Sequence, residues 1–518
     1  MNSAAIVVRT YTVPAATDGG GHMPPGRPNI LLLVSDQERQ RGWIPDGFEL
    51  PNRQRLIDEG IELTNHYTHS SPCSPSRATL MTGMHVPQHG VPDNVIHPHH
   101  SELSPGVPTI GSTMRAAGYR SSYIGKWHLA HGAHPDMEAY GYSDWDGNDL
   151  HFMGWAGTGA HFDPVIASNA ASWLDTNVTG SDQPWFLTVA LVNPHDIVWF
   201  PIDQPWYQDR NPDEVAFIKS LLEAAAWKEG DTIPPYTADY PEIVDELPAS
   251  FEDDLLDKPA CHRQWRWDQQ HGAWGTIDPD DPAQWLRNLD YYLDLHRRGD
   301  ENLGLILHAL DRSGAAEDTV VIFTSDHGDM AGSHGLRSKG PFVYEEIMNV
   351  PLYVRWPGVT QPGSVSSSLS SAVDLFRTIC SIGGAEVPGT VRGVDQSSAF
   401  ADPATSARDH VLFCHDSAHQ TVEMHHTRYA IRGVFDGQYK YAHYYGVKGG
   451  KPTADLAWQP SVKLYPHDAR FEDQEHELYD LDADPHEMVN LAMDMGRRDE
   501  LRKRFAELRA LEEAEFGD

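Results

Sequence analysis

Three short aliphatic runs, each followed at once by polar side chains, constrain the fold of this chain most strongly. They cover Asn29 to Asp36, Trp185 to Val192 and Thr319 to Thr324, and the last two lead into Asn193-Pro194-His195 and Ser325-Asp326-His327-Gly328. Runs without apolar–polar alternation are typical of strands in a parallel sheet covered by helices on both faces. Open α/β sheets bind ligands at the carboxyl ends of such strands. We therefore predict an α/β fold, with a large, mixed, mostly parallel sheet sandwiched by helices.

The pattern along the chain predicts three parts. Residues 1–28, rich in Gly, Pro and Thr, are expected to form a flexible N-terminal arm. Residues 29–404 form the main α/β domain, interrupted over residues 199–285 by an insertion that contains seven of the fifteen tryptophans. Residues 405–518 are predicted to be a smaller α+β subdomain of short strands and a terminal helix. The apolar stripe of that helix is Leu501, Phe505, Leu508 and Leu511.

Charge and composition exclude several classes of partner. The chain has 39 Lys and Arg against 75 Asp and Glu, a net charge of −36, which repels nucleic acids and anionic membranes. Its longest aliphatic run, Ile30 to Val34, is five residues, whereas about 20 are needed to span a bilayer. The N-terminus has no secretory pattern, and the four cysteines form neither a disulfide framework nor a CxxC pair. We expect a cytoplasmic enzyme that binds neither nucleic acid nor membrane.

The most informative motif is Cys73-Ser74-Pro75-Ser76-Arg77. Taken alone, it also fits a buried cysteine before a helix that starts at Pro. Other motifs follow in order: Gly125-Lys126-Trp127-His128-Leu129, Ser325-Asp326-His327-Gly328, and a C-terminal set of Leu478-Tyr479-Asp480-Leu481, Asp484-Pro485 and Asn490-Leu491-Ala492. With Cys73 to Gly83, this series resembles the formylglycine-dependent, type I sulfatases of the alkaline phosphatase superfamily, from Asn29 to roughly Leu491.

The resemblance implies that a maturation enzyme oxidises Cys73 to formylglycine, whose hydrate carries two hydroxyl groups on one carbon. One hydroxyl attacks sulfur and expels the alcohol, and the other then collapses to the aldehyde and ejects sulfate. Covalent catalysis of this kind splits one slow step into two faster ones. Arg77, one helical turn further on, can hydrogen-bond the hydrate, and the helix N-terminus favours a bound anion.

The resemblance also implies one divalent metal, which binds the anion and acidifies the hydrate. Its predicted ligands are Asp36, Gln37, Asp326, His327 and the residue formed from Cys73. Gln37 stands where a second Asp is usual in the family. An amide and an imidazole weaken the preference for Ca²⁺ and admit Mn²⁺. We expect Ca²⁺, with Mn²⁺ as the alternative.

Cationic and acid–base side chains complete the predicted site. By resemblance, Lys126 and His128 lie near the hydrate, where they move protons and hold the oxygens of the transferred group. His195 resembles the histidine that contacts sulfate or protonates the leaving alcohol. Lys339 resembles a lysine that also binds sulfate, although Arg337 is close enough in sequence to compete for this assignment.

These features predict a sulfuric ester hydrolase acting on a small-molecule sulfate monoester, of an aryl or small alcohol. One alternative is a phosphonate monoester or phosphodiester hydrolase with the same site, which Gln37 favours and the Gly125-Lys126-Trp127-His128 motif opposes. A second is a non-catalytic, anion-binding relative. The tryptophan-rich insertion is expected to be either the wall of an aromatic leaving-group pocket or ordinary core, and a homo-oligomer interface is a further possibility for it.

Overall fold

The computed structural model describes residues 26–517, except 97, 99, 146, 153, 179–182, 225–239, 272–273, 417–428 and 447–468. Most of the predicted N-terminal arm therefore lies outside the described residues, as does Trp227 of the insertion. Within the described residues, none of the helices is long and apolar enough to cross a membrane.

The main sheet has seven strands in the order β4-β5-β1-β6-β7-β2-β8. Their bounds are β1 Asn29–Asp36, β2 Ile61–Leu63, β4 Arg120–Gly125, β5 Trp185–Pro194, β6 Thr319–Ser325, β7 Leu352–Arg355 and β8 Ser364–Ser366. β1 is parallel to both β5 and β6, β4 is parallel to β5, and β7 is antiparallel to both of its neighbours. This confirms the predicted mixed, mostly parallel sheet. A short parallel pair, β3 (His66–Tyr67) with β9 (Ser370–Ser371), lies apart from it.

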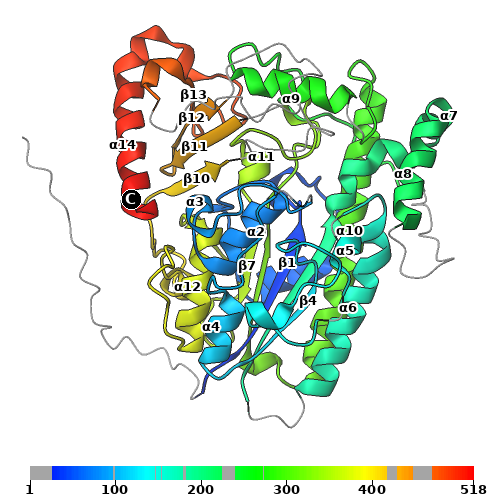
Figure 1. Ribbon diagram of the computed structural model, residues 1–518, viewed down its shortest axis with the longest axis vertical. Helices are drawn as coiled ribbons and strands as arrows, with labels where there is room; N and C mark the ends of the chain where they lie inside the picture. Colours follow the sequence, from blue (N-terminus) through cyan, green and yellow to red (C-terminus); the bar gives the residue numbers. More distant parts are fainter. Residues whose placement is uncertain are drawn as a thin grey trace, which may run out of the picture.

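Helices cover both faces of this sheet (Figure 1). One face is covered by α2 (Cys73–Thr82), α4 (Ile110–Ala116) and α12 (Ala372–Gly383), the other by α6 (Thr158–Asn177) and α10 (Pro282–Ser313). Along β1, Ile30, Leu32 and Val34 pack into the first core and Leu31 and Leu33 into the second. The strand is apolar at every position because it is buried on both sides.

The remaining helices are short or peripheral to the main sheet. They are α1 (Pro51–Asp58), α3 (Val86–His89), α5 (Asp149–Phe152), α7 (Pro205–Arg210), α8 (Pro212–Ala224), α9 (Ala260–His271), α11 (Glu345–Met348) and α13 (Ser397–Ala401). A 3₁₀ helix, η3 (His195–Asp203), follows β5 directly.

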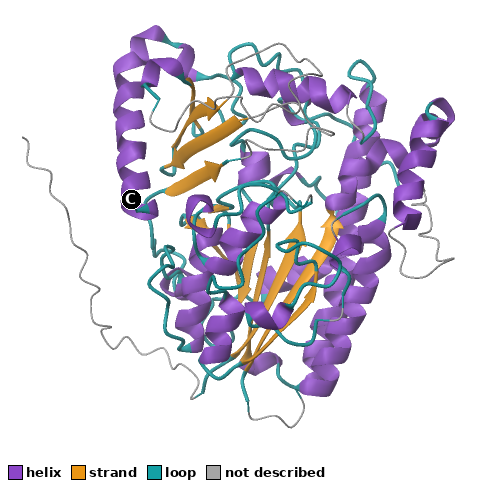
Figure 2. Cartoon of the chain, viewed as in Figure 1, coloured by secondary structure: helices purple, strands orange, loops and turns teal. Residues whose placement is uncertain are grey.

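The C-terminal part is built on a separate antiparallel sheet of four strands, seen apart from the main sheet in Figure 2. Its strands, in spatial and chain order, are β10 (Val411–His415), β11 (Tyr429–Phe435), β12 (Tyr439–Gly446) and β13 (Glu475–Asp480). The terminal helix α14 (Arg498–Phe516) packs on this sheet through the fully buried Leu501 and Leu508, with Phe505 and Leu511 partly buried. The predicted C-terminal α+β architecture is therefore present.

Three of the six described tryptophans of the insertion are buried core residues. Trp199, Trp265 and Trp285 are at most 4% exposed. Trp267 is an exception at 40% exposed, and its ring stacks on His271 at 4.1 Å. Burial, and not an open aromatic wall, accounts for the three buried tryptophans.

Candidate active site

The carboxyl ends of β1, β5 and β6 bring polar side chains to one edge of the main sheet. Asp36 is the last residue of β1, and Asp326 follows β6 directly. The backbone turns sharply at Gln37, which has a φ of 71°, and the Gln37 N–H donates to Asp326 Oδ1 at 3.1 Å. His195 follows β5, the other parallel neighbour of β1. The structure thus brings the predicted strand-end residues to the same edge.

Cys73 is the first residue of α2 and is fully buried beside these strand ends. Its Sγ lies 3.2 Å from His327 Nε2 and 3.7 Å from Asp36 Oδ1. The following residue, Ser74, ties the helix start to the motif after β4, because its Oγ donates to the His128 carbonyl at 2.6 Å. Cys73 therefore lies against two of the predicted metal ligands.

Four of the five predicted metal ligands form one buried cluster. Ligand atoms of Asp36, Cys73, Asp326 and His327 all lie within 4.8 Å of one another. His327 Nδ1 donates to the Gly328 carbonyl at 2.9 Å, which leaves the Nε2 lone pair facing Cys73. Burial lowers the pKa of His327 and keeps its ring neutral. Two carboxylates and a neutral imidazole held by a carbonyl suit a divalent cation, so the residues present fit the predicted metal.

Gln37, the fifth predicted ligand, is bound at the edge of this cluster. Its Oε1 accepts a hydrogen bond from Lys339 Nζ, and its Nε2 donates to Asp329. Asp329 is buried and also accepts the Ala331 N–H at 2.7 Å. It is absent from the predicted site residues, although its place two residues after His327 was the signal that could have identified it.

Arg77 lies between the two carboxylates of the cluster. Its guanidinium group is 2.8 Å from Asp36 Oδ2 and 2.8 Å from Asp326 Oδ2. A third donor, Nη1, bonds the Lys126 carbonyl at 3.0 Å. The side chain is 1% exposed, so Arg77 is a buried counter-ion for both acids.

The surrounding charges give Asp36 and Asp326 different pKa values. Burial alone would raise the pKa of Asp36, but Lys126, 2.7 Å away, and the other cations of the site hold it well below its ordinary value. Burial, followed by the charge of Asp36, raises the pKa of Asp326 to about 6. Asp36 is therefore the more strongly ionised of the pair.

Two buried histidines face the site with free ring nitrogens. Neither nitrogen of His128 has a hydrogen-bond partner among the described residues, nor does Nδ1 of His195. Burial, and then the charge of Lys126, lowers the pKa of His128 well below its ordinary value. Burial, and then the charge of Lys339, does the same for His195. Both rings are thus neutral and able to exchange protons.

The structure separates the two cations that compete near residue 339. Lys339 Nζ reaches Gln37 at the metal cluster. Arg337 instead donates to the carbonyls of Gly275 and Val198 at 3.0 and 2.9 Å. Arg337 therefore fastens the insertion to η3, and Lys339 is the cation that faces the site.

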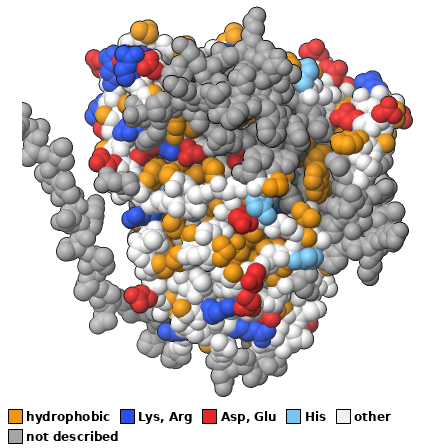
Figure 3. Space-filling model, viewed as in Figure 1, with side chains coloured by type: hydrophobic (Ala, Val, Ile, Leu, Met, Phe, Trp, Pro, Cys, Tyr) orange, Lys and Arg blue, Asp and Glu red, His pale blue; other side chains and the backbone are white. Residues whose placement is uncertain are grey.

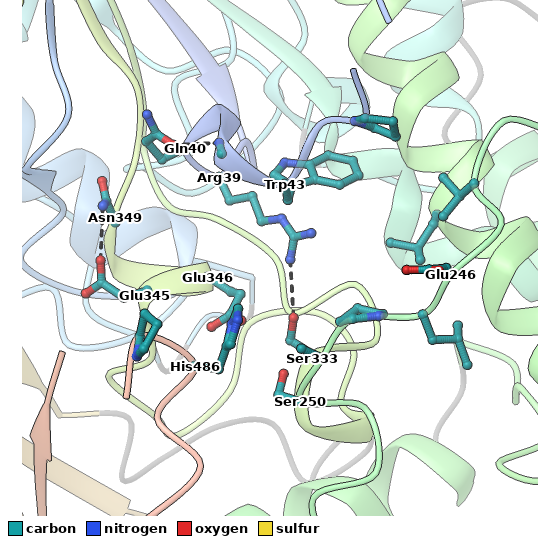
Figure 4. A pocket seen from close by; sticks show the side chains of 18 residues that line it. Arg39, Gln40, Trp43, Glu246, Ser250, Ser333, Glu345, Glu346, Asn349 and His486 are labelled. Carbon is teal, nitrogen blue, oxygen red and sulfur yellow. Dashed lines mark hydrogen bonds between the residues drawn. The ribbon is translucent and has the colours of Figure 1, made fainter. Parts of the chain in front are cut away.

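A cavity of about 470 Å³ lies outside this site, lined by residues of segments 39–45, 244–250, 345–349 and 485–486 (Figure 4). Arg39 projects into it and donates to Ser333 Oγ at 3.5 Å. None of the predicted site residues lines this cavity.

On the face shown in Figure 3, Lys and Arg gather at the upper left, over α14, and toward the lower end of the molecule. Arg502 and Lys503 of α14 are half or more exposed and paired with acids. In contrast, Arg77, Lys126 and Lys339 are buried, so positive charge for an anion is concentrated inside an acidic protein.

Comparisons with known proteins found similar sequences and folds. A sequence model described as "Sulfatase" matches residues 28–385, and one described as "N-sulphoglucosamine sulphohydrolase, C-terminal" matches residues 332–465. The chain is 24% identical to N-acetylglucosamine-6-O-sulfatase of Bacteroides thetaiotaomicron, with 94% of this chain and 86% of the relative covered.

Solved structures resemble the whole fold. A 2-O glycosaminoglycan sulfatase superimposes with a TM-score of 0.68 at 21% identity, covering 95% of this chain and 93% of that one. The phosphonate monoester hydrolase of Agrobacterium radiobacter gives a TM-score of 0.65 at 22% identity, covering 94% and 96%. Both likenesses concern the fold alone.

Proposed function

The chain belongs to the sulfatase family and is a sulfuric ester hydrolase, and we propose that it cleaves a sulfate monoester at the strand-end site, with the nucleophile carried by residue 73. The observation that supports this most is the buried contact of Cys73 with Asp36 and His327, 3.7 and 3.2 Å away. A cysteine needed only for packing would not sit among two carboxylates and an imidazole.

Residue 73 and the metal supply the chemistry that the other side chains cannot. Oxidised to formylglycine and hydrated, residue 73 offers one hydroxyl to form the bond to sulfur as the alcohol leaves, and another to release sulfate. Asp36, Gln37, Asp326 and His327 would hold a divalent cation, Ca²⁺ or alternatively Mn²⁺, which binds anionic oxygen and acidifies a hydroxyl.

The cations of this chain bind and orient the sulfate group. Lys126 and Arg77 offset the charge of Asp36 and Asp326. Lys339, which contacts Gln37, adds a third positive charge. With these charges fixed before the substrate arrives, oxygens that gain charge in the transition state are stabilised without reorganisation.

The two neutral histidines hold and move protons. His128 has both ring nitrogens free within the described structure and can accept the proton of the attacking hydroxyl. His195 lies at the end of β5 and can hydrogen-bond the oxygen of the departing alcohol. We propose a phenol or small alcohol as the leaving group. The half-buried Trp155 follows Gly154, where an added Cβ would lie 2.3 Å from His195 Nδ1, and this places an aromatic residue next in sequence to the His195 pocket.

Turnover of matched esters tests this proposal. An aryl sulfate, a small alkyl sulfate, a hexosamine sulfate, an aryl phosphonate monoester and a phosphodiester would be compared by kcat/KM. We expect the aryl sulfate or the small alkyl sulfate to have the highest kcat/KM. If the hexosamine sulfate had the highest kcat/KM, only the assignment of the leaving group would be overturned. The highest kcat/KM on the phosphonate would favour the rival phosphonate hydrolase, which Gln37 supports.

The mass of the tryptic peptide containing Cys73 tests the nucleophile. In a host that performs the oxidation, the peptide should have lost sulfur and gained an aldehyde oxygen. Full multiple turnover by protein with an unmodified thiol, or by Cys73→Ser, would contradict the assignment. Turnover of no ester in the panel would favour an anion-binding relative.

A further inference from the structure

Three buried aspartates near the site bind neither the metal cluster nor its cations, and each accepts backbone N–H groups. Asp149, Asp163 and Asp196 are all at most 2% exposed. The nearest cations of the site, Arg77 and Lys126, form their ion pairs with Asp36 and Asp326 instead. A buried carboxylate without a cation is costly unless hydrogen bonds compensate for lost water, so each carboxylate has a specific structural reason to be there.

Asp149 holds the loop that follows β4. Its Oδ1 accepts the Trp127 N–H at 2.9 Å and its Oδ2 accepts the His128 N–H at 2.8 Å. The ring of Trp127 is buried in the core, whereas His128 adopts a left-handed conformation with a φ of 57°. Because a non-glycine residue in this region needs support from its surroundings, the paired hydrogen bonds fix where Lys126 and His128 point.

Asp163 and Asp196 hold the neighbouring loop in a reciprocal arrangement. Asp163, on α6, accepts the Val192 and Asn193 N–H groups at the end of β5, at 2.7 and 2.9 Å. Asp196, directly after His195, accepts N–H groups of residues 159 and 160 in the first turn of α6, at 3.1 and 2.8 Å. The strand end and the helix start therefore hold each other, with His195 between them.

We infer that Asp149, Asp163 and Asp196 are positioning residues, whose paired hydrogen bonds to the backbone hold Lys126, His128 and His195 in place for sulfate transfer. Each carboxylate contacts the site through backbone N–H groups and not through a side chain of the site. The inference rests on the proposed function for its effect on rate. The hydrogen bonds themselves can be tested without any turnover.

The principal variant is Asp149→Asn. Its amide keeps one acceptor oxygen but turns an NH₂ group toward the second N–H, which loses its partner. The control is Asp484→Asn in the C-terminal part, since Asp484 accepts the N–H groups of Met488 and Val489 at 3.1 and 2.8 Å. Both changes remove one charge and one hydrogen bond from a turn.

Two measurements on the full chain decide the outcome. Hydrogen–deuterium exchange should be at least tenfold faster for the Trp127 and His128 amides in Asp149→Asn, and unchanged there in Asp484→Asn. Displacement of reacting groups by about 1 Å costs roughly 10²-fold in rate, so kcat should fall about 100-fold in Asp149→Asn with KM changed less than threefold. The control should keep its kcat within twofold.

Unchanged exchange at both amides, or an unchanged kcat despite faster exchange, would overturn the inference. If the wild-type protein hydrolyses no ester, the proposed function fails, and the exchange result still tests the hydrogen bonds. If Asp149→Asn does not fold, Asp149→Glu replaces it, because glutamate keeps both acceptor oxygens. This variant should also speed amide exchange and lower kcat, each by less than Asp149→Asn. For the reciprocal pair, the double variant Asp163→Asn/Asp196→Asn should cost less in kcat than the product of the single costs.

Discussion

Replacing Arg77 with Met tests whether this guanidinium neutralises the two acids of the cluster. The variant keeps a long side chain in the buried space but removes the charge that lies 2.8 Å from both Asp36 and Asp326. Removing one partner of a buried ion pair costs about 3–5 kcal/mol. Lys126 still compensates Asp36 from 2.7 Å, which leaves Asp326 as the unpaired acid, so we expect a loss of about 3 kcal/mol in the free energy of unfolding.

Urea unfolding followed by tryptophan fluorescence measures this loss, first with a chelator present and then with Ca²⁺. The loss should be smaller with Ca²⁺, because a divalent cation between the carboxylates replaces the missing positive charge. The control is Arg115→Met, whose pair with Glu138 is 2.7 Å long but 35% and 62% exposed. Exposed pairs contribute about 1 kcal/mol or less.

Two results would refute the reasoning. A loss in Arg77→Met as small as in Arg115→Met would mean that the buried acids do not need this counter-ion. An equal loss with and without Ca²⁺ would mean that a cation held by the cluster does not offset the charge that the Arg77 substitution removes.

Three further changes test other parts of the site. Gly154→Ala should lower kcat at least tenfold, since a Cβ there would lie 2.3 Å from His195 Nδ1. Lys339→Ala should lower kcat by about 10²-fold or more, as loss of a transition-state contact does, with a smaller change in KM. Glu515→Gln should lower the free energy of unfolding by about 1 kcal/mol between pH 5 and 6.5, and by less above pH 7. Its partner His410, 2.9 Å away, has a raised pKa and loses its proton as the pH rises.

Each of these has its own control or contrary outcome. Gly314→Ala shares a positive φ, but its Cβ would meet nothing within 4 Å, so it should leave kcat unchanged. A Lys339→Ala enzyme with only a raised KM would make Lys339 a docking residue. If the loss in the free energy of unfolding of Glu515→Gln grew above pH 7, the assignment to His410 would be contradicted. Protonated His410 stabilises the pair only below its pKa.

The meeting of the strand ends was predictable, because carboxyl ends of neighbouring parallel strands share one edge of a sheet. Asp36, Asp326 and His195 all follow aliphatic runs, and all three reach that edge. Position in the chain could not distinguish Arg337 from Lys339, since both lie in one loop. The carbonyls that bind Arg337 come from segments about 60 and 140 residues earlier, and only the folded chain brings them there.

The positioning aspartates were less accessible to sequence reasoning for the same reason. Asp149 serves Trp127 and His128 across a loop of about 20 residues, and a lone Asp at a helix start is usually read as a cap. The tryptophans of the insertion show the opposite difficulty. Their enrichment fits an aromatic pocket wall and ordinary core equally well, and only the structure shows that Trp199 and Trp285 lie in one buried cluster with residues of η3 and α10.

The complete burial of Cys73 limits when another enzyme can act on it. Its Sγ is closed in by Asp36 and by His327, a residue about 250 positions further along the chain. At 5–20 residues per second, a ribosome needs roughly 12–50 s to make that stretch. Until β6 is made and pairs with β1, the pocket around Cys73 lacks one wall. The order of synthesis therefore leaves a period in which the thiol is accessible, and folding ends that period.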